Sequence, residues 1–421
     1  MNSREVWVTG CGAVTAAGTG TTALEQALVA ERSCVDRVGG DGGPPSGRVD
    51  VCPPVGRAPD PEPSREGRKL DRSARYFLAA AAEAWEDAGL SDDPPDPCRA
   101  AVVEGSSLGP MQELIEAARR NGAGCGNRFR PSDIVRFMTG AGGAAFAQSH
   151  GIGGPVLHVS GGSVSAACAI GEAALWVASG RVDVAVAGGA ETPLHADIIG
   201  LFGAAGILAG HDGMPAECRP FDVARSGTCL GEGAGIVVLE AADRARGRGR
   251  APLAVLTGYG TGCEAHSMTA PDPTGAAVAC AVRQALGVGD VSDSGMADRV
   301  SRAAADIGWI KAHATGTRQG DASECRGLTA ALGSELSRIP MSGLKPLLGH
   351  CLGASGAVEA VAAVLALGRE LVPATLGTMI VDPRLPRCQV ATHALKLAAP
   401  SVLLLSESFG GRSAALLLRA G

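Results

Sequence analysis

The chain has 421 residues, 46% of them hydrophobic and 19% charged, so it is long enough to form a large core in two packed halves or domains. Its formal net charge of -6 argues against a nucleic-acid-binding protein, which carries a clustered basic excess. Aromatic residues make up only 3% while glycine occurs 61 times, which indicates an aliphatic core with many close backbone approaches.

The N-terminus, MNSREVWVTG, lacks the apolar segment of a secretion signal. The largely apolar run Val358–Leu367 is too short to span a bilayer and predicts a buried helix. The 13 cysteines include no CxxC pair, so we expect neither disulfides nor a metal site. We therefore predict a cytoplasmic protein without membrane association.

Strand and helix patterns alternate along the first part of the chain. Residues 38–68 are rich in glycine, proline and charge, and predict a long surface loop. The regular elements expected in this part are a strand at Val6–Thr9 that runs into Gly10-Cys11-Gly12, helices at Thr21–Ala30, Arg75–Ala88 and Gly171–Gly180, and strands at Arg99–Glu104, Asp183–Ala187 and Gly233–Glu240.

The pattern at the start of the chain occurs again after residue 250. Leu253–Gly260 (LAVLTGYG) resembles Val6–Gly12 (VWVTGCG), because in both a strand enters a Gly-x-Gly turn. This similarity indicates an internal duplication, although two buried strands can also resemble each other by chance. The alternating elements predict an α/β fold with halves at residues 1–250 and 251–421.

A candidate nucleophile lies in the segment Val159–Glu172 (VSGGSVSAACAIGE). There a strand ends, two glycines turn the chain, and Ser163 stands at the start of a helix built from small residues. This position suits a nucleophile, because a backbone N–H can face a developing oxyanion. The alternative is an N-cap serine, which is common.

Two histidines follow in the second half. His313 lies in KAHATGT and precedes Glu324, and His350 lies in GHCLGASG after Lys345. A single histidine in such a place is more often structural. Two of them, each near threonine, lysine or glutamate, suggest an acid–base or oxyanion site.

Together these motifs resemble the β-ketoacyl-carrier-protein synthases, the ketosynthases of fatty acid and polyketide assembly. In chain order the matching segments are Val8–Gly12, Ala187–Glu191 (AGGAE), Arg219–Asp222 (RPFD), Gly231–Gly235 (GEGAG), His313–Glu324, Lys345–Gly356 and Phe409–Gly411 (FGG). The resemblance implies the thiolase fold, with two duplicated α/β halves in a five-layer αβαβα arrangement, usually as a homodimer.

The resemblance also implies roles for individual residues. Ser163 takes the place of the nucleophile, where the family has Thr-Ala-Cys and this chain has Gly161-Gly162-Ser163. Cys168 lies five residues further on and is expected to pack rather than react. The other implied site residues are His313, His350, Lys345 and Glu324 for catalysis, Phe409 and Gly410 for gating, and Thr315, Thr317 and Phe202 for the phosphopantetheine arm or substrate.

The chain departs from the family just before the gating residue. The usual Asn-Ser-Phe-Gly stretch is replaced by Leu405-Ser406-Glu407-Ser408. Directly after it, the N–H of Phe409 is expected to complete an oxyanion hole with the N–H of Ser163. The substitution therefore puts the flexibility of the gating loop and the lining of the pocket in question.

A serine at the nucleophile position changes the expected chemistry. A helix N-terminus can favour a thiolate, but a serine hydroxyl needs a base during attack. Its acyl ester is less activated toward a carbanion, so condensation suffers more than acyl transfer. The expected activity is that of an acyltransferase of polyketide biosynthesis, which moves a chain from a carrier-protein thioester through Ser163 to another acceptor. In having serine at this position, the chain is similar to stand-alone ketosynthase-like proteins of polyether pathways.

Two alternatives remain open at this point. One is a condensing or malonyl-decarboxylating synthase, and the other is a non-catalytic partner similar to a chain-length factor, in a heterodimer with a ketosynthase. The resemblance implies no cofactor beyond the phosphopantetheine of an acyl carrier protein. Carrier proteins are acidic, so a docking patch should be basic. The candidates are Arg119, Arg120, Arg128 and Arg130, which would otherwise be a solvated helix end and loop.

Overall fold

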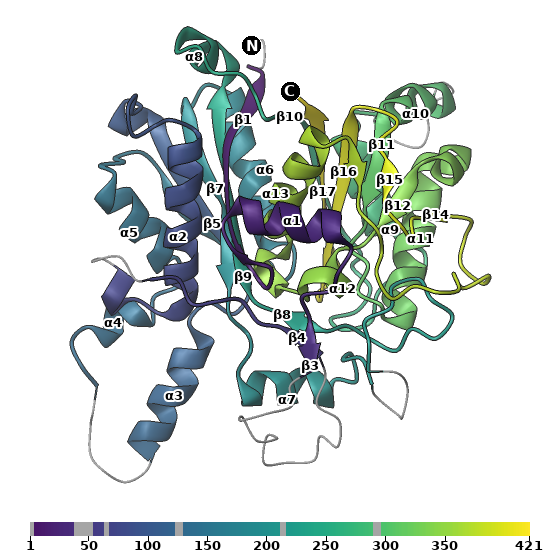
Figure 1. The fold of residues 1–421 in the computed structure, drawn as a ribbon, viewed down its shortest axis with the longest axis horizontal. Coiled ribbons are helices and arrows are strands. Elements are labelled where there is room, and N and C mark those ends of the chain that lie inside the picture. Colours follow the sequence, from purple (N-terminus) through teal and green to yellow (C-terminus); the bar gives the residue numbers. More distant parts are fainter. Residues whose placement is uncertain (1–3, 38–53, 63–66, 123–128, 211–215, 289–295) are drawn as a thin grey trace.

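The computed structural model describes residues 4–37, 54–62, 67–122, 129–210, 216–288 and 296–421 (Figure 1). In the first half, five strands form one part of the main sheet. Their spatial order is β6-β5-β7-β9-β1, with bounds Val156–Val159, Ala100–Gly105, Val184–Glu191, Gly233–Ala241 and Val6–Thr15. β5 runs parallel to β6 and β7, whereas β9 runs antiparallel to β7 and β1.

The second half repeats this order. Its strands lie as β12-β11-β16-β17-β10, with bounds Pro340–Ser342, Ile307–Lys311, Ser401–Ser408, Arg412–Ala420 and Ala254–Cys263. In both halves the spatial order is third, second, fourth, fifth and first strand of that half, with the same parallel and antiparallel pairs. The internal duplication is therefore confirmed. An antiparallel contact between β1 and β10 joins the two halves.

Helices complete a five-layer arrangement, as predicted (Figure 1). α6 (Ser165–Ala178) and α13 (Ser355–Gly368) lie between the two parts of the sheet, and their apolar residues share one core cluster. α2 (Arg72–Asp87) and α5 (Ala141–Ser149) cover the outer face of the first half. α9 (Ala276–Ala285) and α11 (Arg318–Leu332) cover the outer face of the second half.

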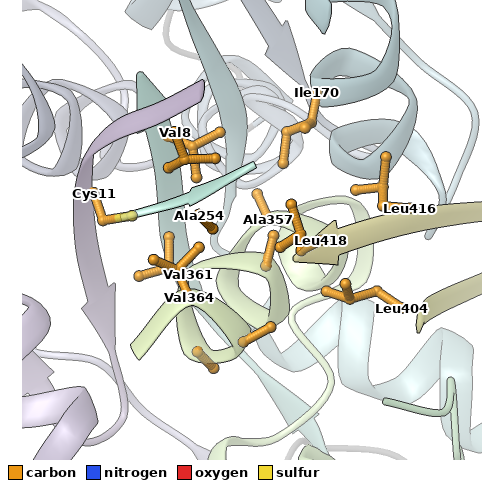
Figure 2. Packing of buried hydrophobic residues seen from close by; sticks show 14 of the residues in the cluster. Val8, Cys11, Ile170, Ala254, Ala357, Val361, Val364, Leu404, Leu416 and Leu418 are labelled. Atoms are coloured by element: carbon orange, nitrogen blue, oxygen red, sulfur yellow. The ribbon is translucent and has the colours of Figure 1, made fainter. Parts of the chain in front are cut away.

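The central core is aliphatic, as the composition indicates. Figure 2 shows Val361 and Val364 of α13 among strand residues such as Val8 and Leu418, with Ile170 from α6 nearby. The predicted buried helix at Val358–Leu367 is confirmed, because it forms most of α13. Each such side chain contributes about 1.5–3 kcal/mol to the stability of the fold when fully buried. Because α13 packs against strands of both halves, this burial holds the two halves together next to the site.

Close packing explains the repeated Gly-x-Gly pattern. A Cβ at Gly12 of β1 would lie 1.9 Å from Ala80 O of α2, and a Cβ at Gly258 of β10 would lie 1.9 Å from Ala285 O at the end of α9. Only glycine permits this approach of helix to strand. Both glycines of each turn make such a contact, Gly10 and Gly12 with α2 and Gly258 and Gly260 with α9, which is the physical basis of the sequence similarity.

Several predicted bounds differ from those observed. α2 begins at Arg72 rather than Arg75, because the Asp71 side chain caps the helix by accepting from Ser73 N and Ala74 N. Residues 38–53 and 63–66 of the predicted surface loop lie outside the described residues. Within the described part the loop prediction is wrong at Pro54–Gly56, which forms β4 and pairs with β3 and β8 while Val55 is buried.

The remaining elements are short or peripheral. They are β2 Gly18–Thr19, α1 Thr21–Ala30, β3 Asp36–Arg37, α3 Met111–Gly122, α4 Asp133–Arg136, α7 Ala196–Ala204, β8 Leu230–Gly231, α8 Ala242–Gly247, α10 Met296–Ala305, α12 Lys345–Leu348, β13 Leu371–Val372, β14 Gln389–Val390 and β15 Leu395–Lys396. Across the described residues, none of the helices has the length and apolarity that a membrane crossing requires.

Candidate active site

A cavity of about 1080 Å³ opens between the two halves. Its walls contain eight of the residues proposed from the sequence, drawn from both halves: Ser163, Phe202, His313, Thr315, Thr317, His350, Phe409 and Gly410. Residues separated by more than 200 positions in the chain therefore meet at one site.

Ser163 is held by a tight turn ahead of α6. Gly162 has φ +71°, a left-handed conformation that glycine adopts without strain. The Ser165 hydroxyl donates to Gly162 O at 2.6 Å and accepts from Gly161 N at 2.9 Å, which fixes the turn. The N-cap residue of α6 is Val164. The alternative role of Ser163 as an N-cap serine is therefore wrong.

His350 is the direct partner of Ser163. Its Nε2 lies 3.1 Å from Ser163 Oγ, and its Nδ1 lies 2.8 Å from Ser355 Oγ at the start of α13. We assign the ring proton to Nδ1, where it donates to Ser355 and leaves Nε2 free to accept from Ser163. Burial lowers the pKa of His350 well below its usual value, and the nearby Lys345 and Lys311 lower it further. His350 is therefore a neutral imidazole that can accept a proton.

His313 stands beside His350, with the two ring centroids 5.4 Å apart and the rings nearly perpendicular. Its Nδ1 lies 3.3 Å from Lys345 Nζ, and Lys345 also donates to His313 O. Burial lowers the pKa of His313 well below its usual value, with further contributions from Lys345 and His350. Both histidines are thus held neutral.

Lys345 and Glu324 support the site from behind. Glu324 accepts from His313 N and, at 2.9 Å, from Ala314 N, whose residue has φ +52°. Neither Lys345 nor Glu324 is among the residues that line the cavity. Both act on the histidine segment rather than on the cavity itself, so they are positioning residues in this structure.

Sequence reasoning missed a buried pair next to this lysine. Glu359 of α13 accepts from Lys345 at 3.0 Å and also from Lys311 of β11, which donates to Leu405 O at 2.6 Å as well. All three charged side chains are buried. The signal was available, because Lys311 and Glu359 each interrupt an apolar run.

One of the two N–H groups expected to form the oxyanion hole is already bonded within the protein. The N–H of Ser163 donates to Ser408 Oγ at 3.0 Å. This contact requires glycine before the nucleophile, because a Cβ at position 162 would lie 2.0 Å from Ser408 Oγ. Phe409 follows directly and is 48% exposed at the cavity.

Thr315 and Thr317 form the adjoining wall. Their hydroxyls lie 3.0 Å apart, and Thr317 caps α11 by accepting from Gly320 N at 3.2 Å. Asp321 holds the same segment, because it accepts from Gly316 N at 3.0 Å and from Phe221 N of the RPFD motif at 2.7 Å. These contacts join the RPFD motif to the segment that follows His313.

Among the residues proposed for docking, Arg119, Arg120 and Arg130 are not part of the cavity lining. Arg119 is half exposed and forms ion pairs with Glu116 and Asp197, which partly neutralise it. Arg120 and Arg130 are exposed, whereas Arg128 lies outside the described residues. Cys168 is partly buried against the central core, as predicted, and does not line the cavity.

The duplicated five-layer fold, with a nucleophile turn facing two buried histidines, defines the class of condensing enzymes and their relatives. The family model for the Beta-ketoacyl synthase N-terminal domain matches residues 3–245, and that for the Beta-ketoacyl synthase C-terminal domain matches residues 253–379. The chain belongs to the β-ketoacyl synthase family.

Known relatives cover nearly the whole chain. The Tetracenomycin polyketide synthase ketoacyl synthase alpha subunit of Streptomyces glaucescens is 31% identical over 99% of this chain and 97% of its own length. The 3-oxoacyl-[acyl-carrier-protein] synthase 2 of Vibrio harveyi is 33% identical over 84% of this chain and 83% of its own.

Two solved structures support the same conclusion. The AntDE:AntF structure, a type II PKS acyl-carrier protein in complex with its ketosynthase bound to the hexaketide, matches with a TM-score of 0.85 and 26% identity over 100% of both chains. The ishigamide ketosynthase/chain length factor matches with a TM-score of 0.85 and 28% identity over 100% of both chains. The chain is thus similar to the ketosynthases and chain length factors of polyketide synthases.

Proposed function

We propose that this protein is a ketosynthase-like acyltransferase of polyketide biosynthesis. It takes an acyl chain from a carrier-protein thioester onto Ser163 and passes it to a second acceptor. The contact between Ser163 Oγ and His350 Nε2, 3.1 Å long and inside the cavity, carries this proposal. A serine needs such a base, because its hydroxyl does not ionise at neutral pH.

The first half-reaction is a direct exchange of ester for thioester. His350 Nε2 accepts the hydroxyl proton while Ser163 Oγ attacks the thioester carbonyl, and the new C–O bond replaces the C–S bond. The proton on His350 then passes to the departing phosphopantetheine sulfur. In the second half-reaction an acceptor thiol loses its proton to His350 and attacks the acyl ester. A new C–S bond replaces the C–O bond, and the proton on His350 returns to Ser163 Oγ, which regenerates the hydroxyl.

The charges around His350 limit the rate of this exchange. An imidazolium ion at His350 would be repelled by Lys345 and Lys311, the groups that lower its pKa. Its second nitrogen bonds to the neutral Ser355 hydroxyl, whereas an Asp or Glu at that place would stabilise the ion. We therefore expect transfer to be slow, which is sufficient if the enzyme transfers each finished chain only once.

The proposed donor and acceptor are acyl carrier proteins, and no other cofactor is proposed. This assignment rests on similarity to a ketosynthase that is bound to its carrier protein. The exposed Arg120 and Arg130, with Arg119 and Arg128, are the proposed docking residues. The proposed compartment is the cytoplasm.

The proposed quaternary contact is a dimer through β6. This strand ends the main sheet, where among the described strands it pairs with β5 alone. Val156 and Leu157 on it are 45% and 40% exposed. An exposed apolar edge strand is typical of a surface that another chain covers. The second chain is either another copy or a related ketosynthase.

A non-catalytic partner subunit is the second candidate, and the similarity to a ketosynthase/chain length factor favours it. The two candidates differ in one observable. Intact-protein mass spectrometry after incubation with acyl carrier proteins should show an acyl adduct on the wild type and none on Ser163→Ala. A wild type that stays unmodified, or an alanine variant that still gains acyl mass, contradicts the proposed function.

A further inference from the structure

Glu407 is part of the wall of the cavity that contains Ser163. It precedes Ser408, whose hydroxyl contacts Ser163 N, and both residues line the cavity. Alternate residues of a strand face the same side, and Leu403 and Leu405 of β16 pack in the cluster formed with α9 and α11. Glu407 continues that face, so its carboxyl group lies on the wall that leads to Thr315 and Thr317.

The protein leaves this carboxyl group incompletely bonded. Glu407 Oε1 is shut off from solvent and, among the described residues, has no hydrogen-bond partner. Thr228 Oγ1, on another part of the cavity lining, is also buried without a partner there. A buried polar atom without a hydrogen bond is costly. The carboxyl group of Glu407 therefore has hydrogen-bonding capacity at the cavity wall that the protein leaves unused, and a ligand in the cavity can use it.

The surroundings favour a neutral acid at position 407. Burial raises the pKa of Glu407 well above its usual value, and the nearby carboxyl groups of Glu324, Glu264 and Asp321 raise it further. A neutral carboxyl group both donates and accepts hydrogen bonds. A hydroxyl or a ketone is therefore a suitable partner, whereas an ammonium group would call for the carboxylate form.

We propose that Glu407 recognises acyl chains that carry a hydroxyl or keto oxygen close to the thioester, and so selects them over unsubstituted chains. Glu407 directly precedes Ser408, which contacts Ser163, and it lines the same cavity as Ser163, so we expect the recognised oxygen to lie near the thioester end of the chain. This inference rests on the proposed function, and it adds to it the class of acyl chain that the site takes.

The test compares matched chains on one carrier protein: butanoyl, 3-hydroxybutanoyl and acetoacetyl. We expect the oxygenated chains to acylate wild-type Ser163 about tenfold faster, as a site with a buried hydrogen-bonding group rejects an analogue that lacks the partner. Glu407→Gln keeps a donor and an acceptor and should retain the preference. Glu407→Leu has a similar size without either and should lose it.

A matched control comes from the second carboxyl group of the cavity. Glu264 lines the same wall, but its Oε2 already accepts from Asp272 N at 2.8 Å. Glu264→Gln should therefore leave the preference unchanged. Equal rates for the three chains on the wild type, or a preference that survives Glu407→Leu, would overturn the proposal.

A binding measurement separates this proposal from the proposed function. Amide-linked analogues of the three chains cannot acylate serine, so their affinities for Ser163→Ala, with and without Glu407→Leu, report recognition alone. Tighter binding of the oxygenated analogues, lost in Glu407→Leu, supports the role of Glu407 even if no acyl-serine forms. Acylation of Ser163 without any such preference would refute this role alone.

Discussion

The N–H of Ser163 donates to the hydroxyl of Ser408, so the proposed nucleophile and the residue before Phe409 are joined across 245 positions of sequence. An N–H engaged in this way cannot stabilise an oxyanion until the segment at Ser408 withdraws. The absence of a side chain at Gly162 makes this contact possible. Glycine at 162 and serine at 408 are therefore a matched pair.

Replacing Ser408 by glycine should free the N–H and speed acylation of Ser163. The hydrogen bond that no longer has to break is worth about 1 kcal/mol, or roughly a fivefold change in rate. Mass spectrometry of the acyl-enzyme in samples quenched at successive times would measure this change in rate. Gly162→Ala alone should slow acylation or unfold the turn, and adding Ser408→Gly should recover part of the loss. Slower acylation in Ser408→Gly would instead show that the Ser408 hydroxyl assists the reaction.

Ser163→Cys should accept acyl chains faster than the wild type. Cysteine and serine differ little in size, and the turn ahead of α6 places a thiol at a helix N-terminus, which favours the thiolate. With malonyl carrier protein this variant should form at least traces of β-ketoacyl product, detected by mass spectrometry. Condensation by the serine enzyme at the rate of an ordinary ketosynthase would refute chain transfer. A cysteine variant that is well acylated yet never condenses would place the block in Leu405–Ser408.

The rate of acylation should not decline in mildly acidic solution. The pKa of His350 lies well below 6.5 because of burial and the nearby lysines, so the neutral form of the base persists as the pH falls through 6.5. The rate should therefore fall only at a lower pH, as His350 gains its proton. A profile of acyl-serine formation against pH, measured at constant ionic strength, checks this. A midpoint at or above pH 6.5 would disagree with the structure.

Glu359→Gln should strongly destabilise the fold. It leaves Lys311 and Lys345 buried without their shared counter-charge, and loss of one partner from a buried pair costs about 3–5 kcal/mol in free energy of unfolding. Glu25→Gln is the matched control, because its pair with Arg369 is much more exposed and is worth about 0–1 kcal/mol. Denaturant unfolding of both variants measures the difference. Equal stabilities would mean that the buried network is not an essential part of the fold.

Reversal of charge at Arg128 and Arg130 should slow transfer from a carrier protein, most clearly at low salt, where charge steering is strongest. A small thioester mimic should react as before, because it makes no carrier-protein contact and Arg130 does not line the cavity. Arg302→Glu on α10 changes an exposed charge on the second half and serves as the control. Equal losses with carrier protein and mimic would point to a change in the active site.

The sequence was most informative where contacts are local or where glycine is required. The bounds of α1 and the paired Gly-x-Gly turns follow from such patterns. The site was located because its motifs resemble those of a known family, although Lys345 and Glu324 proved to lie behind the cavity rather than in it. An apolar run interrupted by Lys311 or Glu359 marks each as a buried charge, but local patterns do not reveal that the two pair, nor that Ser408 contacts Ser163, because these contacts join distant segments.

The junction between β1 and its neighbours has a consequence for how the chain folds. Val6 of β1 pairs with Ala241 on one side and with Leu256 on the other, so both of its partners lie more than 230 residues later in the chain. Such non-local pairing slows folding, because the chain must close a long loop before it gains the contact. During synthesis one edge of β1 therefore stays unpaired until β10, at the start of the second half, has been made. A fragment that stops at residue 250 would keep one edge of β1 open, and we expect it to aggregate.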